Sequence, residues 1–553
     1  TLTPMLASRL LKKTDIQKKE KAEKNGLFSK VLKLYKRTLL WSLNNRWKVL
    51  IISIAGIVFS IALLLTGMIN TEFMAKSDQS FISIDISLSP GSTLKQTNEK
   101  VVEVENYLHK TKEIKNYFTI VGGNGQSGSD KAVARLYVNL VPKKERKKSQ
   151  SEVASEVREF GKKIPGIDFQ VTESDSGGGS GKPIAIKIKG KDEDTLKALS
   201  NEVEKLLKSI PGTTDIGNST KVRNSEIRIS VDRLAASKYG LNTSDIGGVI
   251  RVALSGNQVG VYRANNEEND ITLKFMKGEV QSINDIKNIR VSNSQGQQIL
   301  LSQVATVEKT DTSPSIEREG KQDVAVVDAN VQGRVAGPVI NDIKAKLKSL
   351  KVPSGYTIGF GGEDKSMNEA GRSLMLALGA SIALIYMILV VLYESYLTPA
   401  IRMVALPFAL MGALIALAVT GQSLNVMSGI GIIMLEGLSS KNGTLLIDYT
   451  NTLMKRGMTL KDALIESGMT RLRPIIMTSA TMIVAMLPVT LALGEGSEMK
   501  RSMGVVIIGG MIVSTVVTPI VLPVVYTFID DFKNFIFRKK RSKKVKEAGE
   551  YEL

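Results

Sequence analysis

The chain has 553 residues, of which 43% are hydrophobic and 23% are charged, and its formal net charge at pH 7 is +20. It contains no cysteine and one histidine, His109, which excludes thiol nucleophiles, disulfide frameworks, Cys/His zinc sites and histidine-based triads. Six stretches of about 18 residues or more are nearly free of charge, which is the length that crosses the ~30 Å hydrocarbon core of a bilayer. We therefore predict a polytopic membrane protein.

The positive charge is concentrated beside the predicted spans. Residues 1–48 carry 13 Lys and Arg against 3 Asp and Glu, residues 451–474 carry 5 against 2, and residues 530–553 carry 8 against 5. These segments hold 16 of the 20 net charges, so the positive-inside rule places all three in the cytoplasm. A nucleic-acid-binding protein would instead carry such charge on one soluble domain. We expect contacts with anionic lipid and no nucleic-acid partner.

The N-terminal segment predicts a linker and then a helix on the membrane surface. The chain begins at Thr1 without an initiator methionine or a signal peptide, and we expect it to be a piece of a longer protein. Residues 12–24 are strongly charged and read as a solvated linker. Apolar residues within 28–39 recur on one helical face with Lys and Arg elsewhere, which indicates a basic amphipathic helix. Trp47 then marks the interface before the first span, residues 49–69.

Residues 70–372 read as a folded block outside the membrane, on the extracytoplasmic side. They carry 44 Lys and Arg against 39 Asp and Glu, close to balance. Alternating apolar residues predict strands near 82–88, 184–188 and 324–331, each followed by a helix-like run. Repeated strand–helix–strand units predict ferredoxin-like βαβ subdomains, with helices packed on one face of each sheet. The stretch 224–313 interrupts the second unit, and we interpret it as an inserted subdomain.

Five more apolar stretches complete the predicted bundle: residues 373–392, 403–420, 424–449, 475–493 and 503–528. The predicted fold is thus a polytopic α-helical membrane protein with six transmembrane helices and a large α+β extracytoplasmic domain. The predicted domains are a linker and surface helix (1–48), a first span (49–69), a first porter-like subdomain (70–180), a second one in two parts (181–223 and 314–372), the insert (224–313), a five-helix bundle (373–528) and a basic cytoplasmic tail (529–553).

Two glycine-rich segments resemble nucleotide-binding loops only formally. Gly123, Gly125 and Gly128 satisfy G-x-G-x-x-G, but the residues after them alternate like a strand, so no helix N-terminus faces a phosphate. Residues 177–183 (GGGSGKP) lack the first glycine and the final Ser or Thr of a phosphate loop and read as a flexible linker. His109 lies among lysines in a polar helix and reads as a surface residue. We expect no cofactor.

Three charged residues lie in the fourth predicted span: Glu436, Lys441 and Asp448. A lysine near mid-membrane costs about 2.5–3.5 kcal/mol on insertion scales, so Lys441 should face the bundle interior and have a partner. Asp448 lies seven residues on and almost on the same face, but about 10 Å nearer the cytoplasm, so we expect it at the interface and not as the counter-ion. No other span offers a carboxylate at depth, and the natural partner of Lys441 is therefore missing from the chain. Glu436 lies about 140° away and has two interpretations, a proton carrier or a satisfied glutamate.

A basic pair lies at the cytoplasmic end of the next span. Arg471 and Arg473 precede Pro474, and Thr478 follows about one turn inside. Two interpretations remain open. One is positive-inside anchoring, with hydroxyls bonded to the backbone. The other is a polar path that brings protons from the interface towards Lys441.

Several long motifs, in order along the chain, resemble the resistance-nodulation-division (RND) efflux transporters of hydrophobic and amphiphilic compounds. The most specific are in the spans, and others match the family's opening segment, its post-span segment and its docking subdomain. The motifs are GLSSKNGTLLIDY (437–449), RLRPIIMTS (471–479), LYESYLTPAIRM (392–403), TLTPMLASRLLKK (1–13), EFMAKSDQ (72–79) and DRLAASKYGLNTSDI (232–246).

The resemblance implies a transporter and not an enzyme: a trimeric proton antiporter in the plasma membrane, with twelve spans per full protomer built from two similar halves. Its partners would be protons, amphiphilic small molecules, membrane lipids, other protomers, and a periplasmic adaptor with an outer-membrane channel. This chain resembles the second half. The resemblance makes Lys441 the relay lysine with Asn442 beside it, Arg471 the cytoplasmic-side arginine and Thr478 the relay hydroxyl. The paired aspartates of the first half are absent, and Glu436 stands at a usually apolar family position.

Alternative functions belong to related and unrelated classes. A metal-cation exporter is disfavoured because the outer block offers only Met74, Met276 and Met367 as soft ligands, and we expect no metal site. A protein- or lipid-translocating relative is disfavoured by the docking-like motif. A further alternative is an inactive membrane-anchored fragment or scaffold. We therefore predict proton-driven efflux of drugs, detergents or surfactants.

Overall fold

The structure is a computed structural model, and it describes residues 27–89, 91–123, 130–173, 182–221, 224–264, 267–276, 280, 282–312 and 316–549. The linker predicted at 12–24, Gly125 and Gly128 of the first glycine motif, residues 177–181 of the second motif and the motif at 1–13 lie outside these ranges. The side chains of the basic tail beyond Asp531 are likewise outside the described set.

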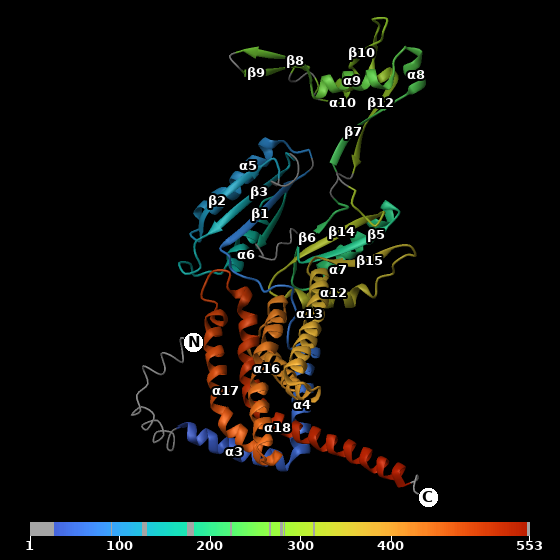
Figure 1. The fold of residues 1–553 in the computed structure, drawn as a ribbon. Coiled ribbons are helices and arrows are strands. Elements are labelled where there is room, and N and C mark those ends of the chain that lie inside the picture. Colours follow the sequence, from blue (N-terminus) through green and yellow to red (C-terminus); the bar gives the residue numbers. More distant parts are fainter. Residues whose placement is uncertain are drawn as a thin grey trace.

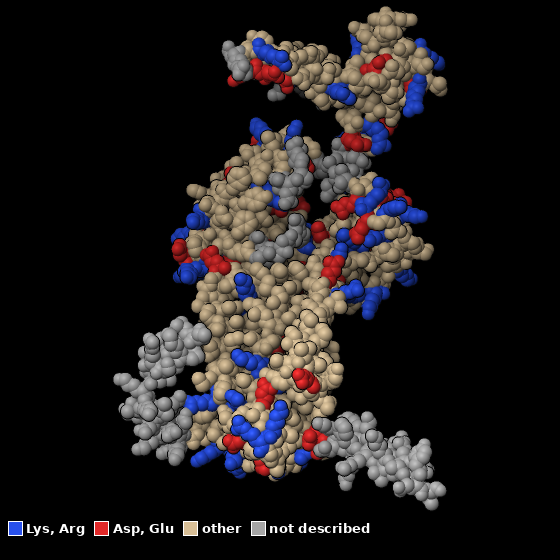
Figure 2. Space-filling view, viewed as in Figure 1, with Lys and Arg blue, Asp and Glu red and all other residues tan. Residues whose placement is uncertain are grey.

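The described chain forms a helical bundle that carries two sheet-containing units side by side, with a third unit beyond them (Figure 1). We call the end of the bundle next to the sheets the sheet side and the opposite end, where α3 lies, the α3 side. Charged side chains gather on the sheet units and around the α3 side, with a largely uncharged band between them (Figure 2). By the positive-inside rule, the α3 side corresponds to the predicted cytoplasmic face.

The bundle is made of eight helices within the described ranges. Five apolar segments among the described helices are long enough to cross a membrane: α4, α13, α14 with α15, α17, and the part of α18 up to Asp531. The remaining long helix, α16, packs among them and carries Glu436, Lys441 and Asp448. The helices are α3 (Leu27–Asn44), α4 (Arg46–Leu65), α13 (Gly362–Tyr393), α14 (Leu397–Met403), α15 (Ala405–Thr420), α16 (Val426–Lys455), α17 (Leu460–Leu491) and α18 (Glu498–Gly549).

Three helices extend well beyond the spans predicted for them. Helix α17 begins fifteen residues before the span predicted at 475–493, and α18 continues past the span predicted at 503–528. The span predicted at 373–392 is the apolar part of α13, which begins eleven residues earlier, at Gly362. Its first turns are polar, so hydropathy did not include them, yet the chain passes directly from strand β15 (Thr357–Gly361) into the helix. Gly362 has φ +59°, and a Cβ there would lie 2.5 Å from the carbonyl oxygen of Pro183, so this tight junction requires glycine. A continuous helix thus joins the second sheet to the bundle.

The first sheet unit has the order β2-β3-β1-β4 with every neighbour antiparallel, and helices α5 and α6 pack against it. Alternation in β1 buries Ile82, Ile84 and Ile86 completely, as the sequence pattern predicts. Helix α5 begins with a capping box between Thr93 and Gln96. The elements are β1 (Phe81–Leu88), α5 (Leu94–Lys110), β2 (Ile114–Val121), β3 (Val133–Leu140), α6 (Gln150–Gly161) and β4 (Ile167–Glu173).

The second sheet unit repeats this β-α-β-β-α-β arrangement. Strand β14 pairs with β5 on one side and with β6 and the short β13 on the other, while β5 also pairs with β15. Helices α7 and α12 share its core. The elements are β5 (Ile184–Gly190), α7 (Glu193–Lys208), β6 (Thr213–Asn218), β13 (Arg318–Glu319), β14 (Gln322–Val331), α12 (Ala336–Leu347) and β15.

A third unit is inserted between β6 and β13. The paired strands β7 and β12 lead to it, and a small core of its own holds it together. The antiparallel pair β8 and β9 extends from it as an exposed hairpin (Figure 1). The elements are β7 (Asn224–Val231), α8 (Arg233–Lys238), α9 (Thr243–Leu254), β8 (Asn257–Ala264), β9 (Glu267–Leu273), α10 (Ile283–Lys287), β10 (Arg290–Ser292), β11 (Gln298–Leu300), α11 (Leu301–Val304) and β12 (Ala305–Thr312).

Polar contacts fix the sheet units to each other and to the bundle. The Arg158 guanidinium of the first unit pairs with Asp215 of the second at 3.1 Å, and both side chains are buried. On the bundle, the Lys143 ammonium pairs with Glu498 at the start of α18. The amide of Gly496 also donates to the carbonyl oxygen of Asp78, at 3.1 Å. The loop between α17 and α18 is therefore connected to the first sheet unit.

Small residues allow α15 and α18 to cross closely. A Cβ on Gly412 would lie 2.6 Å from the carbonyl oxygen of Gly509, and a Cβ on Gly509 would lie 2.2 Å from the Cβ of Ala416. Contacts of this kind are the usual basis of helix association in membranes, where the hydrophobic effect contributes little between helices.

We predict that Gly412→Leu destabilises the bundle, because the new side chain would overlap α18, an overpacking that typically costs about 1–3 kcal/mol. The measurement is the melting temperature of the detergent-solubilised protein. Gly379→Leu in α13 is the matched control, since a Cβ there meets nothing within 4 Å. Equal melting temperatures for the two variants would contradict the close crossing.

Candidate functional site

Helix α16 carries the candidate site, and its start is rigidly held. Asn425 caps the helix: its Oδ1 accepts from the Ser428 amide at 2.9 Å, and the Ser428 hydroxyl accepts from the Asn425 amide at 2.7 Å. The Ser502 hydroxyl of α18 donates to the same Oδ1 at 2.9 Å. Ahead of the cap, Leu424 forms a parallel bridge with Thr71, just after α4. These bonds fix the depth and rotation of every later side chain on α16.

The Lys441 side chain lies on an exposed face of α16, whereas its neighbour Asn442 is buried. Both line a cavity of about 250 Å³ between α16 and α17, and Thr478 and Thr481 lie on its other wall. The position is fifteen residues into a thirty-residue helix, about 22 Å from its start at 1.5 Å per residue. The structure therefore brings Lys441, Asn442 and Thr478 to one cavity near mid-helix.

A chain of hydroxyl groups lies behind this cavity. The Asn442 amide donates to the Ser479 hydroxyl at 3.5 Å, and Thr515 of α18 donates to the same oxygen at 2.7 Å. About one turn earlier on α16, the hydroxyls of Ser439 and of Ser514 on α18 are 2.6 Å apart. Hydroxyl groups both donate and accept, so such a cluster accommodates a change of proton position without leaving a polar group unpaired.

Among the described residues, the Lys441 ammonium has no ion-pair partner. Asp448, the carboxylate that shares its face, instead accepts hydrogen bonds from Arg402 of α14 and from the Tyr393 hydroxyl, the latter at 2.8 Å. This agrees with the expectation that Asp448 is not the counter-ion of Lys441. A charged lysine at this depth in a membrane costs free energy unless an anion pairs with it. We therefore expect an anionic partner to contact the exposed face of α16 at Lys441.

Arg471 and Thr478 lie on α17 at different depths. The Arg471 guanidinium stacks 4.7 Å from the centre of the Tyr449 ring, and its Nε is buried without a hydrogen-bond partner in the described structure. Thr478 lies seven residues further, about 10 Å towards the sheet side. Its hydroxyl donates back to the carbonyl oxygens of Pro474 and Ile475, at 3.1 and 3.0 Å. The hydroxyl bonded to the backbone fits the anchoring interpretation, and the position of Thr478 at the Lys441 cavity fits the interpretation of a polar path for protons.

Glu436 does not join this group. Its carboxylate is 8% exposed and accepts from the Ser381 hydroxyl of α13 at 2.7 Å. It lines a different cavity, between α13, α15 and α16. The structure therefore separates Glu436 from Lys441, Asn442 and Thr478.

Sequence reasoning overlooked Arg402. Its side chain is completely buried, its guanidinium carbon lies 3.5 Å from the centre of the Tyr393 ring, and it pairs with Asp448. The contact joins the end of α13, α14 and α16 at the α3 side. The sequence signal that could have indicated this ion pair was an arginine at the edge of one apolar stretch together with an aspartate near the end of another.

The fold and the site together define a membrane transporter chain of the RND type. The chain belongs to the AcrB/AcrD/AcrF family, whose model matches residues 1–530. Its fold is similar to that of a crystallised heavy metal efflux pump, with a TM-score of 0.79 at 23% identity over 92% of this chain and 52% of that one.

Two curated relatives show comparable similarity. The swarming motility protein SwrC of Bacillus subtilis (strain 168) is 28% identical over 542 residues, which are 96% of this chain and 50% of the relative. The cation efflux system protein CzcA of Alcaligenes sp. (strain CT14) is 28% identical over 525 residues, 91% of this chain and 49% of the relative. The chain thus spans about half the length of the curated relatives it matches.

We predict that Asp448→Leu destabilises the protein, on the order of 3 kcal/mol, because it leaves the buried Arg402 charge without its partner. The double variant Arg402→Leu/Asp448→Leu should recover most of this loss, since no unpaired charge then remains. Melting temperatures of the solubilised variants measure both effects, with the exposed Glu466→Gln as control. A double variant as unstable as the single one would contradict the pairing.

Proposed function

We propose that the chain supplies the lysine side of a proton relay in a transporter that expels amphiphilic small molecules in exchange for protons. The observation that carries the proposal is the position of Lys441, at mid-helix, beside a cavity, and without an anion among the described residues. The missing anion would come from a part of the transporter that this half-length chain does not contain. Protonation of that anion would release Lys441 and shift α16.

The contacts of α16 support a path for such a shift. Helix α16 packs on α13, α15, α17 and α18, and α13 continues directly into the second sheet unit. The loop before α18 contacts the first sheet unit through Lys143 and Glu498. Movement of the bundle would therefore change the relation of the two sheet units, which is what an alternating-access cycle requires. In this proposal Asn442 and Thr478 position the lysine, and Arg471 lies at the α3 end of the polar path that leads to it.

The substrate proposal rests on the donor groups available. Within the described ranges, no three His, Cys, Asp or Glu side chains cluster closely enough to hold a metal ion. The outer block contains only three methionines in its sequence. Two of them, Met74 and Met367, line different cavities and so do not form one thioether site. An amphiphile needs only apolar walls with a few polar groups. Efflux of metal cations is the second candidate function, because one relative is named a cation efflux system protein and the similar solved structure is named a heavy metal efflux pump.

The proposed location and partners follow from the resemblance to the RND transporters. The protein would lie in the plasma membrane with its sheet units on the outer face, assemble as a homotrimer of full-length protomers, and act with an adaptor and an outer channel where the cell has an outer membrane.

We predict that Lys441→Ala, introduced at the chromosomal locus, abolishes efflux without loss of folding. Lys441→Arg should also fail, because a planar, wider guanidinium does not replace the compact ammonium in its contact with the anion. The readouts are tolerance of amphiphilic compounds, protein level in the membrane and melting temperature. Lys455→Ala, an exposed lysine at the end of the same helix, is the control and should export normally. Undiminished tolerance in Lys441→Ala at equal expression would refute the relay.

A second prediction separates the two substrate classes. Deletion of the gene should make cells more sensitive to detergents and lipophilic drugs, while tolerance of cobalt, zinc and cadmium salts stays unchanged. Minimum inhibitory concentrations of both sets measure this. Sensitivity to the metal salts alone would replace the amphiphile proposal with cation efflux.

A further inference from the structure

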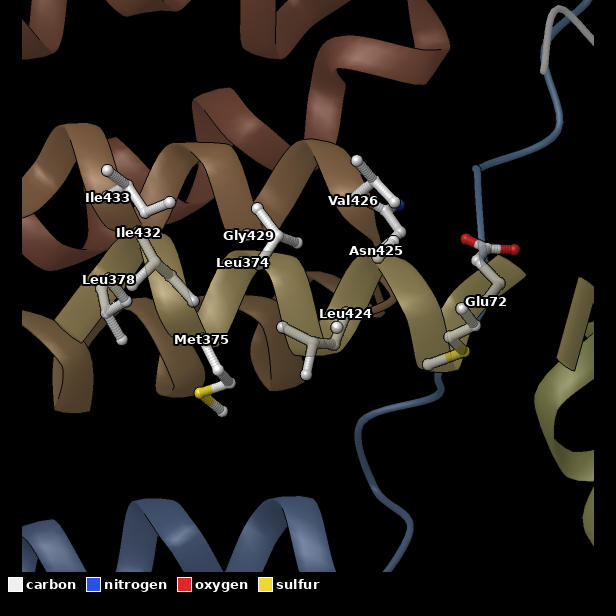
Figure 3. A pocket seen from close by; sticks show the side chains of 13 residues that line it. Glu72, Leu374, Met375, Leu378, Leu424, Asn425, Val426, Gly429, Ile432 and Ile433 are labelled. Carbon is white, nitrogen blue, oxygen red and sulfur yellow. The ribbon is translucent and has the colours of Figure 1, made fainter. Parts of the chain in front are cut away.

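A groove on the outside of the bundle is not part of the Lys441 site. Its outer part, of about 160 Å³, lies between α13 and α16 near the sheet side, and its inner part, of about 330 Å³, lies deeper between α13, α15 and α16. Leu378 and Ile432 line both parts, so the two cavities adjoin. We call them together the lateral groove. Figure 3 shows its outer part, with Leu378 and Met375 from α13 beside Ile432 from α16.

The walls of the lateral groove are almost entirely apolar. Leucine, isoleucine, methionine and alanine side chains from the three helices line most of it. Two carboxylates interrupt this surface: Glu72 at the outer mouth and Glu436 in the inner part. In the part of the chain that the structure describes, no lysine or arginine lines either cavity. The groove therefore combines a hydrocarbon-like surface with one deep carboxylate, that of Glu436.

The inner carboxylate is deep and lacks a cation. Glu436 is ten residues into α16, about 15 Å from its start. Its one hydrogen bond among the described residues is from Ser381, whose hydroxyl also donates to the carbonyl oxygen of Leu378. Lys441 lies about 140° away around α16 and lines the other cavity. A carboxylate that stays charged at this depth needs a group of opposite charge, so the ligand that complements a charged Glu436 is a cation.

We propose that the lateral groove binds cationic amphiphiles with one alkyl chain, the cationic head at Glu436 and the chain along the apolar walls. The proposal rests on the proposed efflux function and names one class of its substrates. Charge complementarity selects this occupant over a phospholipid, whose phosphate would be repelled by Glu436 and whose head group belongs at the interface. It also selects against anionic surfactants. One carboxylate without other donors is too few ligands for a metal ion.

The first test uses four surfactants with the same twelve-carbon chain: dodecyltrimethylammonium (cationic), dodecyl maltoside (neutral), dodecylphosphocholine (zwitterionic) and dodecyl sulfate (anionic). With Glu436→Gln at the chromosomal locus, tolerance of the cationic surfactant should fall to that of the gene deletion, while tolerance of the other three stays within about twofold of wild type. Glu202→Gln, an exposed carboxylate of α7, is the matched control and should leave all four unchanged.

The outcomes distinguish this proposal from the relay. If Glu436→Gln lowers tolerance of all four surfactants as Lys441→Ala is expected to do, Glu436 belongs to proton coupling and the groove proposal is wrong. If it changes none while Lys441→Ala abolishes export, the groove proposal fails and the proposed function stands. If Lys441→Ala exports normally, the proposed function fails whatever Glu436→Gln does.

A binding measurement tests the site without transport. The purified chain in phosphatidylcholine nanodiscs is titrated with dodecyltrimethylammonium by calorimetry, with the neutral maltoside as reference. Loss of a buried charge pair weakens binding strongly, so Glu436→Gln should bind the cation roughly tenfold less tightly or worse and the maltoside unchanged. Melting temperatures show whether the variant is folded. A folded Glu436→Gln protein with unchanged affinity for the cation would overturn the proposal.

Discussion

A charge inside a membrane must have a partner, and the bundle is organised around how each of its charges meets this requirement. Arg402 and Asp448 form an ion pair, with the Tyr393 ring against the guanidinium. Glu436 accepts one hydroxyl hydrogen bond beside an apolar groove. Lys441 has no anion in the described structure and lies beside a cavity. The first pair holds helices together, whereas we propose that Lys441 and Glu436 meet partners from outside this set of helices.

The same requirement explains why α16 is held so precisely. Its cap is bonded to α18, and the residue before the cap is bridged to the segment after α4. Close packing of glycines against α18 continues along the helix: a Cβ on Gly431 would lie 3.1 Å from the carbonyl oxygen of Met503. Close packing of this kind resists local rearrangement, so a shift of α16 would move the neighbouring helices with it. Since α13 runs unbroken into the second sheet unit, such movement has a rigid route out of the membrane (Figure 1).

Sequence reasoning predicted the parts of this structure that depend on local pattern. Alternation predicted β1 and β5, apolar length predicted most of the bundle, and the cost of a lysine near mid-membrane indicated Lys441. It missed what depends on contacts between distant segments. The polar start of α13 has no hydropathy signal, and its helical path follows from the tight junction at Gly362. Arg402 looked like a boundary residue, because its burial arises only when α13, α14 and α16 meet. Likewise, periodicity placed Glu436 on a different side of α16 from Lys441, but only the packing of α13 revealed the groove it lines.

If Lys441 couples proton movement to substrate movement, the most direct measurement is the proton flux that accompanies transport of a substrate. The complete transporter is reconstituted in liposomes with a pH-sensitive dye inside, and an amphiphilic substrate is added under an imposed proton gradient. We expect substrate-dependent proton flux with the wild-type protein and none with Lys441→Ala, although that variant should still bind the substrate. Equal flux from the two proteins would contradict this coupling.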